Sequence, residues 1–181
     1  YIYKTLTKIF IYTSKMQGKV LISTPSVLDE IFFKSVILIT YYSKFESVGL
    51  ILNKPSKLNL SDIIELEYLN HFPLYYGGPV ERNTIQYFHT LHDIPESYKI
   101  NNQLYWGGNF EFILKLIREN KINFNNIRFF IGYSGWGHNQ LANELNQKDW
   151  IIQDLDSEKF MNTDINLWKD IMKKNKYSLW V

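Results

Sequence analysis

The fold of this chain is decided by the stretch IRFFIGYSGWGHNQLANELNQ, residues 127–147. Its opening part, 127–133, is rich in β-branched and aromatic residues and is apolar on both faces, which is typical of a central strand covered on both sides. Residues 140–147 are expected to form a helix, because Asn139 can accept the free N–H groups of its first turn. The glycine-rich segment 132–137 lies between the two. We therefore predict a strand, a tight turn and a helix in this order.

In the rest of the chain, hydrophobic periodicity and the positions of Gly and Pro predict further short strands and helices that alternate along the sequence. Strands are expected where β-branched or aromatic residues run up to polar or Gly/Pro punctuation, at 19–23, 35–42, 48–52, 74–76, 85–88, 104–106 and 150–153. The last of these is also apolar on both faces and is expected to be central. Helices are expected at 60–69, 110–120 and 165–174, capped by Asn59, Asn109 and Asp164. No repeat or linker interrupts the alternation, so we predict a single domain that mixes helices and strands.

Composition supports one folded domain and limits its chemistry. The chain has 181 residues, of which 45% are hydrophobic and 17% aromatic, and this is ample material for one core. It contains no cysteine, which removes disulfides, thiolate catalysis and the commonest zinc ligands, and suits a reducing compartment. We therefore expect a soluble cytoplasmic protein without a metal or cofactor, in which any reaction uses oxygen or nitrogen groups.

The charge pattern gives little support to nucleic-acid binding. The formal net charge is +2, because 17 lysines and three arginines stand against 18 acidic residues. The single alanine beside many isoleucines and asparagines indicates an A/T-rich genome. The lysines are scattered, whereas a DNA-binding surface more often shows clustered arginines. The tightest group, at 169–176, lies at the end of an expected helix, where cations complement the helix dipole. No run of 18 apolar residues is present, so no membrane span is expected.

The first 15 residues differ from the rest of the chain. They carry three lysines and no acid, and their apolar run is too short for the core of a secretory signal. We expect residues 1–15 to be disordered, or to be leader sequence read from a start codon placed too early, and residues 16–181 to form the domain. A weak organellar targeting segment is the alternative.

The glycine corner at 132–137 is the first candidate for binding. If it is a loop between a strand and a helix, its free main-chain N–H groups and the positive end of the helix can hold a phosphate or a carboxylate. Its glycines match neither the dinucleotide fingerprint nor the phosphate loop, and no Lys-Ser or Lys-Thr follows them. A structural turn fixed by a buried Trp136 is the interpretation that we favour.

Ser134 in the same segment raises the alternative of a hydrolase. A nucleophile elbow needs glycine two residues after the serine, and this chain has Trp136 there. The serine would also need an imidazole and a carboxylate, for which His89, Asp93 and Glu144 qualify by residue type alone. We therefore predict no catalytic residue, and keep a hydrolase that uses Ser134 and His89 as an alternative.

His89, His92 and Asp93 are close enough in sequence to suggest a metal site. They lie at the end of an expected strand, in which residues three apart point to opposite sides, so a shared metal would require a bend after Thr90. A hydrogen-bonded structural imidazole at His89 is the interpretation that we favour.

Five segments follow one another in a characteristic order: GKVLISTPSVLDEIFFKSVILIT (18–40), VGLILNKP (48–55), YYGGPV (75–80) with the following YFHT (87–90), FFIGYSGWGHNQLANEL (129–145) and the later Trp150. From Gly18 to about Trp168 the chain resembles the AlgH/YqgE family of small bacterial proteins. The resemblance implies an α+β fold, with a single domain whose mixed, bifurcated β-sheet forms a pseudo-barrel flanked by helices. It also implies a largely uncharacterised function, for which some members are called transcriptional regulators.

The resemblance also implies a groove and shows departures from the family pattern. Tyr41-Tyr42-Ser43 stands where members usually have Glu-His-Asn, which weighs against an obligatory acid–base role there. Asn139 stands where members usually have glycine, and asparagine is the residue that next best tolerates left-handed geometry. The predicted binding residues border the family's groove or the glycine corner, and they are Asn53, Lys54, Pro55, Gly77, Gly78, Pro79, His89, Gly132, Tyr133, Ser134, Gly135, Trp136 and Gln140.

From sequence we favour a non-catalytic cytosolic module that binds a small anion or a protein, because glycine corners are present without a credible acid–base pair. The loop residues Asp29, Lys34 and Ser35 are further candidates for contact with an anionic partner, with a loop ion pair as the alternative. A transcriptional regulator or another nucleic-acid-associated protein is the second hypothesis, and it rests on the naming of family members. The hydrolase is the third.

Overall fold

The computed structural model describes residues 16–162 and 165–175. Within them the strands are β1 (Val20–Ser23), β2 (Val36–Tyr42), β3 (Ser47–Ile51), β4 (Pro55–Asn59), β5 (Pro73–Tyr76), β6 (Val80–His89), β7 (Tyr98–Lys99), β8 (Tyr105–Trp106), β9 (Ile127–Trp136) and β10 (Trp150–Gln153). The helices are the 3-10 helices η1 (Leu60–Asp62) and η2 (Glu67–Leu69) and the α-helices α2 (Phe110–Arg118), α3 (Gln140–Asn146), α4 (Ser157–Met161) and α5 (Leu167–Lys174). The predictions for residues 1–15 and for Asp164 as a helix cap fall outside the described residues.

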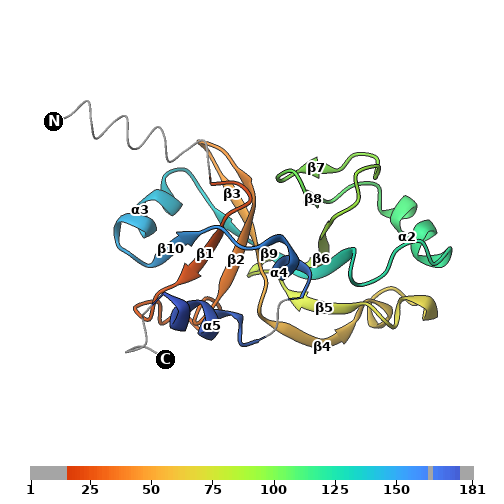
Figure 1. Ribbon diagram of the computed structural model, residues 1–181, viewed down its shortest axis with the longest axis horizontal. Coiled ribbons are helices and arrows are strands. Elements are labelled where there is room, and N and C mark those ends of the chain that lie inside the picture. The colour runs from red at the N-terminus through yellow and green to blue at the C-terminus, as the bar shows by residue number, and fades with distance from the viewer. Residues whose placement is uncertain (1–15, 163–164, 176–181) are drawn as a thin grey trace.

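The sheet is built around β9, which runs through the middle of the molecule (Figure 1). One edge of β9 pairs antiparallel with β6, from Ile127 opposite His89 to Tyr133 opposite Val80. The other edge pairs parallel with β5 over residues 129–131 and then antiparallel with β3 over residues 134–136. The sheet therefore divides along β9. One branch continues from β3 through β2 and β1 to β10, and the other passes through β5 to β4.

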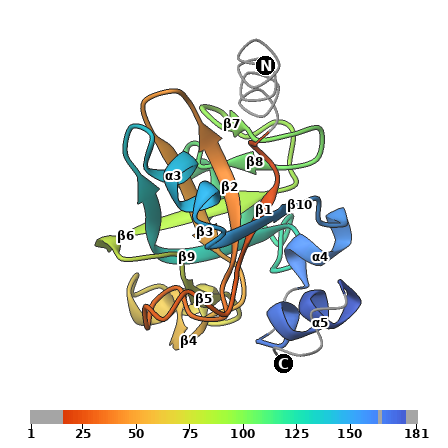
Figure 2. The same cartoon turned by 90° about the vertical axis from the view of Figure 1, so that its left-hand side faces the viewer.

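The divided sheet curls on itself, as the view along the long axis of the molecule shows (Figure 2). Beyond β6 it continues through β8 to β7, so that β10 and β7 are the two ends of the main strand order. Helices α3 and α2 lie at opposite ends of the long axis (Figure 1). The pairing of β5 with β9 is parallel and the others are antiparallel, so the sheet is mixed. The expected single α+β domain with a bifurcated sheet in a pseudo-barrel is confirmed.

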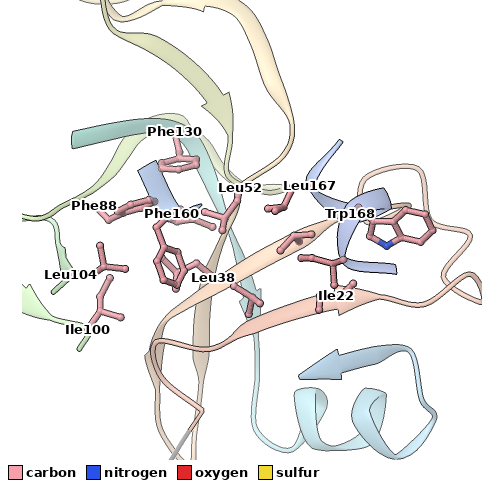
Figure 3. Close-up of a cluster of buried hydrophobic side chains, with 14 of the residues drawn as sticks. Ile22, Leu38, Leu52, Phe88, Ile100, Leu104, Phe130, Phe160, Leu167 and Trp168 are labelled. Atoms are coloured by element: carbon pink, nitrogen blue, oxygen red, sulfur yellow. The ribbon is translucent and has the colours of Figure 1, made fainter. Parts of the chain in front are cut away.

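Three clusters of buried apolar side chains hold the layers together. The first lies between the concave side of the sheet and α4 and α5, where Phe88, Phe130 and Phe160 meet (Figure 3). The second lies under α2 and the third under α3. Apolar residues alternate between clusters along one strand, as in β2, where Leu38 belongs to the first and Ile39 to the third. Both faces of the central strands are therefore covered.

The helix predictions had mixed outcomes. Helix α2 was predicted together with its cap, and Asn109 Oδ1 accepts the N–H of Phe112 at 2.9 Å. Helix α3 begins as expected, and Asn139 adopts the expected left-handed conformation, with φ 60°, but its side chain makes no capping bond. The helix predicted at 60–69 is wrong. Two 3-10 turns stand there instead, separated by Leu66 in an extended conformation.

The strand predictions were right for the core of the sheet and wrong in two respects. Segment 150–153 is an edge strand and not a central one, because only β1 pairs with it. Its side chains nevertheless pack into cores on both faces, which accounts for the apolar pattern. The strand predicted at 127–133 continues to Trp136 and takes in the expected turn. The short strands β4 and β7 and the helix α4 had not been predicted.

Within the described residues, no helix combines the length and the apolar character that crossing a bilayer requires.

Candidate functional site

The structure brings part of the predicted binding site together where the connection between β5 and β6 crosses β9. A Cβ atom added to Gly77 would lie 2.2 Å from the carbonyl oxygen of Gly132, and one added to Gly78 would lie 2.3 Å from that of Tyr133. The hydroxyl of Ser134 donates to the carbonyl of Gly77 at 3.0 Å. The two segments are therefore in contact backbone to backbone. The crossing is close-packed scaffold and leaves no space for a ligand between them.

The predicted turn and anion cradle at 132–137 are wrong. Residues 134–136 pair with β3, and Tyr133 pairs with Val80 of β6, so the main-chain groups of the segment face neighbouring strands. The N–H of Gly137 is also engaged, because it donates to Oε1 of Gln140 at 3.1 Å. What the sequence analysis took for a loop is the bent second half of β9, in which Gly132 has a φ of 65°.

The geometry of Ser134 and His89 does not form a catalytic pair. Ser134 is fully buried and its hydroxyl is bonded to a main-chain carbonyl. His89 lies opposite Ile127, at the other end of β9. Ser134 is seven positions after Ile127 along the strand, which corresponds to roughly 20 Å. A nucleophile and its base must be within hydrogen-bond reach, and these two groups are not.

His89 is the structural imidazole that was expected. It is fully buried, and its Nε2 lies 3.0 Å from the carbonyl oxygen of Gly107 and 3.1 Å from the hydroxyl of Ser97. Its Nδ1 accepts the N–H of Leu91 at 3.3 Å, which leaves the proton on Nε2. Burial lowers the pKa of His89, and the hydrogen bonds with the main chain of Gly107 and Leu91 oppose this shift. The ring is therefore neutral near pH 7.

His92 and Asp93 do not join His89 in a metal site. His92 Nδ1 is hydrogen-bonded to the hydroxyl of Tyr105 at 2.7 Å, and the ring of Tyr105 stacks on His89 with centroids 5.8 Å apart. The tyrosine thus separates the two imidazoles. In the part of the chain that the structure describes, no three carboxylate or imidazole side chains gather closely enough to hold a metal ion.

Asn53 is a buried connector between two elements and is not presented to a ligand. It is 3% exposed, its Oδ1 accepts the N–H of Val36 at 2.8 Å, and its Nδ2 donates to the carbonyl of Lys34 at 2.8 Å. The carboxamide therefore ties the end of β3 to the start of β2.

Lys54 is held by the loop that precedes β2. Its Nζ donates to the carbonyls of Glu30, at 3.2 Å, and of Ile31. Burial lowers the pKa of Lys54, and the nearby Asp29 opposes that shift. Pro55 is exposed and pairs with Tyr75 as the first residue of β4. The lysine is therefore a clamp on the loop and has donors committed to the main chain.

Trp136 and Gln140 belong to a separate cluster under α3. Oε2 of Glu144 accepts the indole N–H of Trp136 at 2.8 Å and that of Trp150 at 2.7 Å. Its Oε1 accepts the side-chain amide of Gln140 at 3.0 Å. One carboxylate thus fastens α3 to β9 and β10. The predicted residues consequently occupy four places: the strand crossing, the junction of β3 with the loop before β2, the His89 region and this cluster.

Arg128 is a buried polar residue that the sequence analysis missed. It is 3% exposed, and its guanidinium donates to the carbonyls of Phe160, at 2.8 Å, and Leu52, at 2.9 Å. It also lies over the ring of Tyr75, with its Cζ 3.9 Å from the ring centroid. Burial lowers the pKa of Arg128 to about 10, so it remains charged at neutral pH. An arginine inside the apolar run of 127–131 was the available signal, because buried charges are normally partnered.

Three of the surface hollows in the described part of the structure bear on the prediction, and none of the three is lined by any of the thirteen predicted binding residues. The first, of about 350 Å³, lies between the end of β10 and helices α4 and α5. The second, of about 420 Å³, is shallow and includes His92 and Glu158. The third, which we call the lysine hollow, has a volume of about 210 Å³ and is lined by Lys34, Ile165, Asn166, Trp168 and Lys169. Lys34 is the one loop residue from the sequence analysis that reaches this last hollow.

Comparison with known proteins places the chain among bacterial relatives. An AlgH-like family model matches residues 20–180. A UPF0301 protein of Bacteroides fragilis is 44% identical over 168 residues, which is 91% of this chain and 86% of that protein. A UPF0301 protein of Bacteroides thetaiotaomicron is 41% identical over 169 residues, again 91% of this chain and 86% of the relative.

Two solved structures share the architecture. The solution structure of the AlgH protein from Pseudomonas aeruginosa superposes with a TM-score of 0.76 at 20% identity, covering 89% of each chain. A crystal structure of a Corynebacterium diphtheriae protein gives a TM-score of 0.73 at 24% identity, covering 88% of this chain and 86% of the other. At these identities the likeness speaks for the fold alone.

Proposed function

This chain belongs to the AlgH-like family, and from its own residues we propose that it is a non-catalytic binding module, which holds a ligand or a protein partner without transforming it. The absence of cysteine supports a cytoplasmic setting for this role.

One observation carries the proposal: the groups best suited to acid–base or nucleophilic chemistry are already engaged in hydrogen bonds within the protein. The hydroxyl of Ser134 is bonded to the main chain, both nitrogens of His89 are bonded within the core, and the carboxylate of Glu144 accepts two indole N–H groups. Catalysis needs such a group within reach of a substrate atom. These three lie at separate places and face protein atoms.

A binding role also fits what remains on the surface. The lysine hollow combines cationic and apolar walls, whereas the strand crossing and the cluster under α3 are closed by packing. Binding sites commonly join an apolar wall to a few placed polar groups.

The test is a binding screen on the purified protein with a catalytic arm. Thermal stability is measured against inorganic phosphate, nucleotides and small carboxylates, and a tagged form is used to capture partners from lysate. A ligand at a hundred times its Kd should stabilise the folded state by about 2.7 kcal/mol. No shift with any compound, together with no specific partner, would contradict the proposal.

The catalytic arm uses chromogenic ester and phosphoester substrates. We expect no turnover. Turnover that disappears in Ser134→Ala would replace the binding module by a hydrolase, and a salt-dependent mobility shift with DNA would replace it by a nucleic-acid-associated protein.

A further inference from the structure

The lysine hollow lies where α5 meets the loop between β1 and β2. Trp168 forms its rigid wall: the side chain is 3% exposed, and its indole N–H donates to the carbonyl of Ser23 at 2.7 Å. Trp168 sits at the rim of the first core cluster (Figure 3). Ile165, which is 68% exposed, adds a second apolar surface. The hollow therefore has an apolar lining that is fixed from behind by the core.

Two ammonium groups flank this lining. Nζ of Lys34 lies 5.3 Å from the ring centroid of Trp168 and 5.2 Å from that of Phe33. Aromatic faces orient a cation without accepting its N–H groups in ordinary hydrogen bonds, so the three donors of Lys34 stay available. Within residues 16–162 and 165–175, neither Lys34 nor Lys169 forms an ion pair with a carboxylate.

Asp29, Glu30 and Asp170 are close to the two lysines in sequence, but none of them lines the lysine hollow. Oδ1 of Asp29 accepts the N–H groups of Ile31 and Phe32, at 2.9 and 3.1 Å. Asp170, next to Lys169, lines the hollow between β10 and the C-terminal helices. Among the residues that the structure describes, the lining of the lysine hollow contains two cations and no acid. Opposite charge on a ligand is what such a site recognises.

We infer that the lysine hollow binds a small organic anion, a carboxylate or phosphate monoester carried on a compact apolar body. The two lysines receive the anionic group, and Trp168 and Ile165 receive the apolar body. A volume of about 210 Å³ is below the range typical of drug-sized ligands, which favours a body no larger than a single ring. The inference rests on the proposed binding role and names its ligand class.

The experiment is calorimetric titration of the full chain with benzoate, phenyl phosphate, acetate and benzamide. Benzoate or phenyl phosphate should bind, and whichever binds more tightly identifies the anionic group. Benzamide, which keeps the ring and loses the charge, and acetate, which keeps the charge and loses the ring, should both bind at least about fivefold more weakly. Raising the salt to 0.5 M should weaken benzoate binding.

Three variants locate the site. Lys169→Gln and Lys34→Gln should each weaken binding about threefold to fivefold, since each removes one exposed charge partner. Lys57→Gln, on the exposed strand β4, is the matched control and should leave affinity unchanged. Lys34 has a φ of 53°, in the left-handed region, so a substitution there can impair folding. If the Lys34 variant folds poorly, Lys169→Gln alone still tests the site.

Each failure has a distinct meaning. Binding that is unaffected by both lysine variants would overturn the inference and leave the binding role in place. Acetate that binds as tightly as benzoate would overturn the part given to Trp168 and Ile165. No binding of any of the four compounds would also overturn the inference, and the lysate capture then decides separately whether the binding role survives.

Discussion

At Gly77 a hydrogen in place of a side chain is a structural requirement, because the backbone of β9 passes directly over it. A methyl group there would lie 2.2 Å from the carbonyl oxygen of Gly132, and that oxygen belongs to the backbone of a central strand and cannot turn away. We expect Gly77→Ala to destabilise the fold by at least about 3 kcal/mol, measured by urea unfolding. Gly135→Ala is the matched control, since its nearest contact would be an ordinary 3.4 Å. It should cost under about 1 kcal/mol, and equal losses would refute the packing argument.

His89 should make the protein less stable in acid. Burial lowers its pKa in the folded state below the value of about 6.5 in the unfolded chain, so the unfolded state binds a proton first as the pH falls. The stability contributed by the neutral ring is fully present above pH 6.5 and is lost as the pH falls through the folded-state pKa.

The measurement is the free energy of unfolding of wild type and His89→Gln between pH 7.5 and 5. The variant lacks this titration and should show the smaller decrease. Identical decreases in the two proteins would remove His89 from the explanation.

At the level of elements, the sequence predicts well wherever local pattern and burial agree. Helix α2 has its cap, its apolar face and its expected position because Asn109 and the apolar spacing act locally. Segment 60–69 has comparable local signals, yet Leu60 and Leu69 are both fully buried and Leu66 between them is extended. Tertiary packing thus prevails over local preference there. For β10, the apolar pattern correctly predicted that both faces are buried. It could not predict whether one or both edges of the strand pair with another strand.

The attachment of helix α3 depends on one carboxylate. Glu144→Ala would leave the indole N–H groups of Trp136 and Trp150, residues that are 4% and 6% exposed, without their acceptor. We expect a loss of about 2 kcal/mol or more in the free energy of unfolding. Glu144→Gln should recover part of it, because an amide oxygen can still accept.

Glu119→Ala serves as the comparison, since Glu119 is an acid at the end of α2 that pairs with Lys121 on the surface. It should leave the free energy of unfolding nearly unchanged. If Glu144→Ala were equally mild, the carboxylate would not be what holds α3 in place.

At the scale of the whole molecule, the candidate site was harder to predict than the fold. The family resemblance, and not the residues themselves, suggested that the glycines at 77, 78 and 132 lie near one groove, and the structure has them in contact. Their contact with one another excludes a ligand, which spacing could not reveal. The lysine hollow joins Lys34 to Ile165, Asn166, Trp168 and Lys169, which are far from it in sequence and become its neighbours only in the folded chain.

Arg128 links three parts of the molecule, so its replacement should also change the stability of elements other than its own strand. Its guanidinium bridges the carbonyls of Leu52 after β3 and Phe160 in α4 from within β9. A lysine ammonium cannot span both in the same geometry. We expect Arg128→Lys to cost about 2–4 kcal/mol and to increase amide exchange in α4, measured by mass spectrometry.

Arg118→Lys, in the last turn of α2, is the control for the change of residue type and should leave both quantities nearly unchanged. A destabilised Arg128→Lys protein with normal exchange in α4 would show that the bridge to Phe160 contributes nothing.

The three strands that pair with β9 all precede it in the chain, and this has a consequence for biosynthesis. While the ribosome is still adding residues before 136, β3, β5 and β6 have emerged without the strand they share, and β1 waits until residue 153 for β10. Pairings this distant form slowly and leave adhesive edges uncovered in the meantime. The nascent polypeptide consequently reaches its native strand order only after β10 has been synthesised, and until then it exposes strand edges of the kind that chaperones protect.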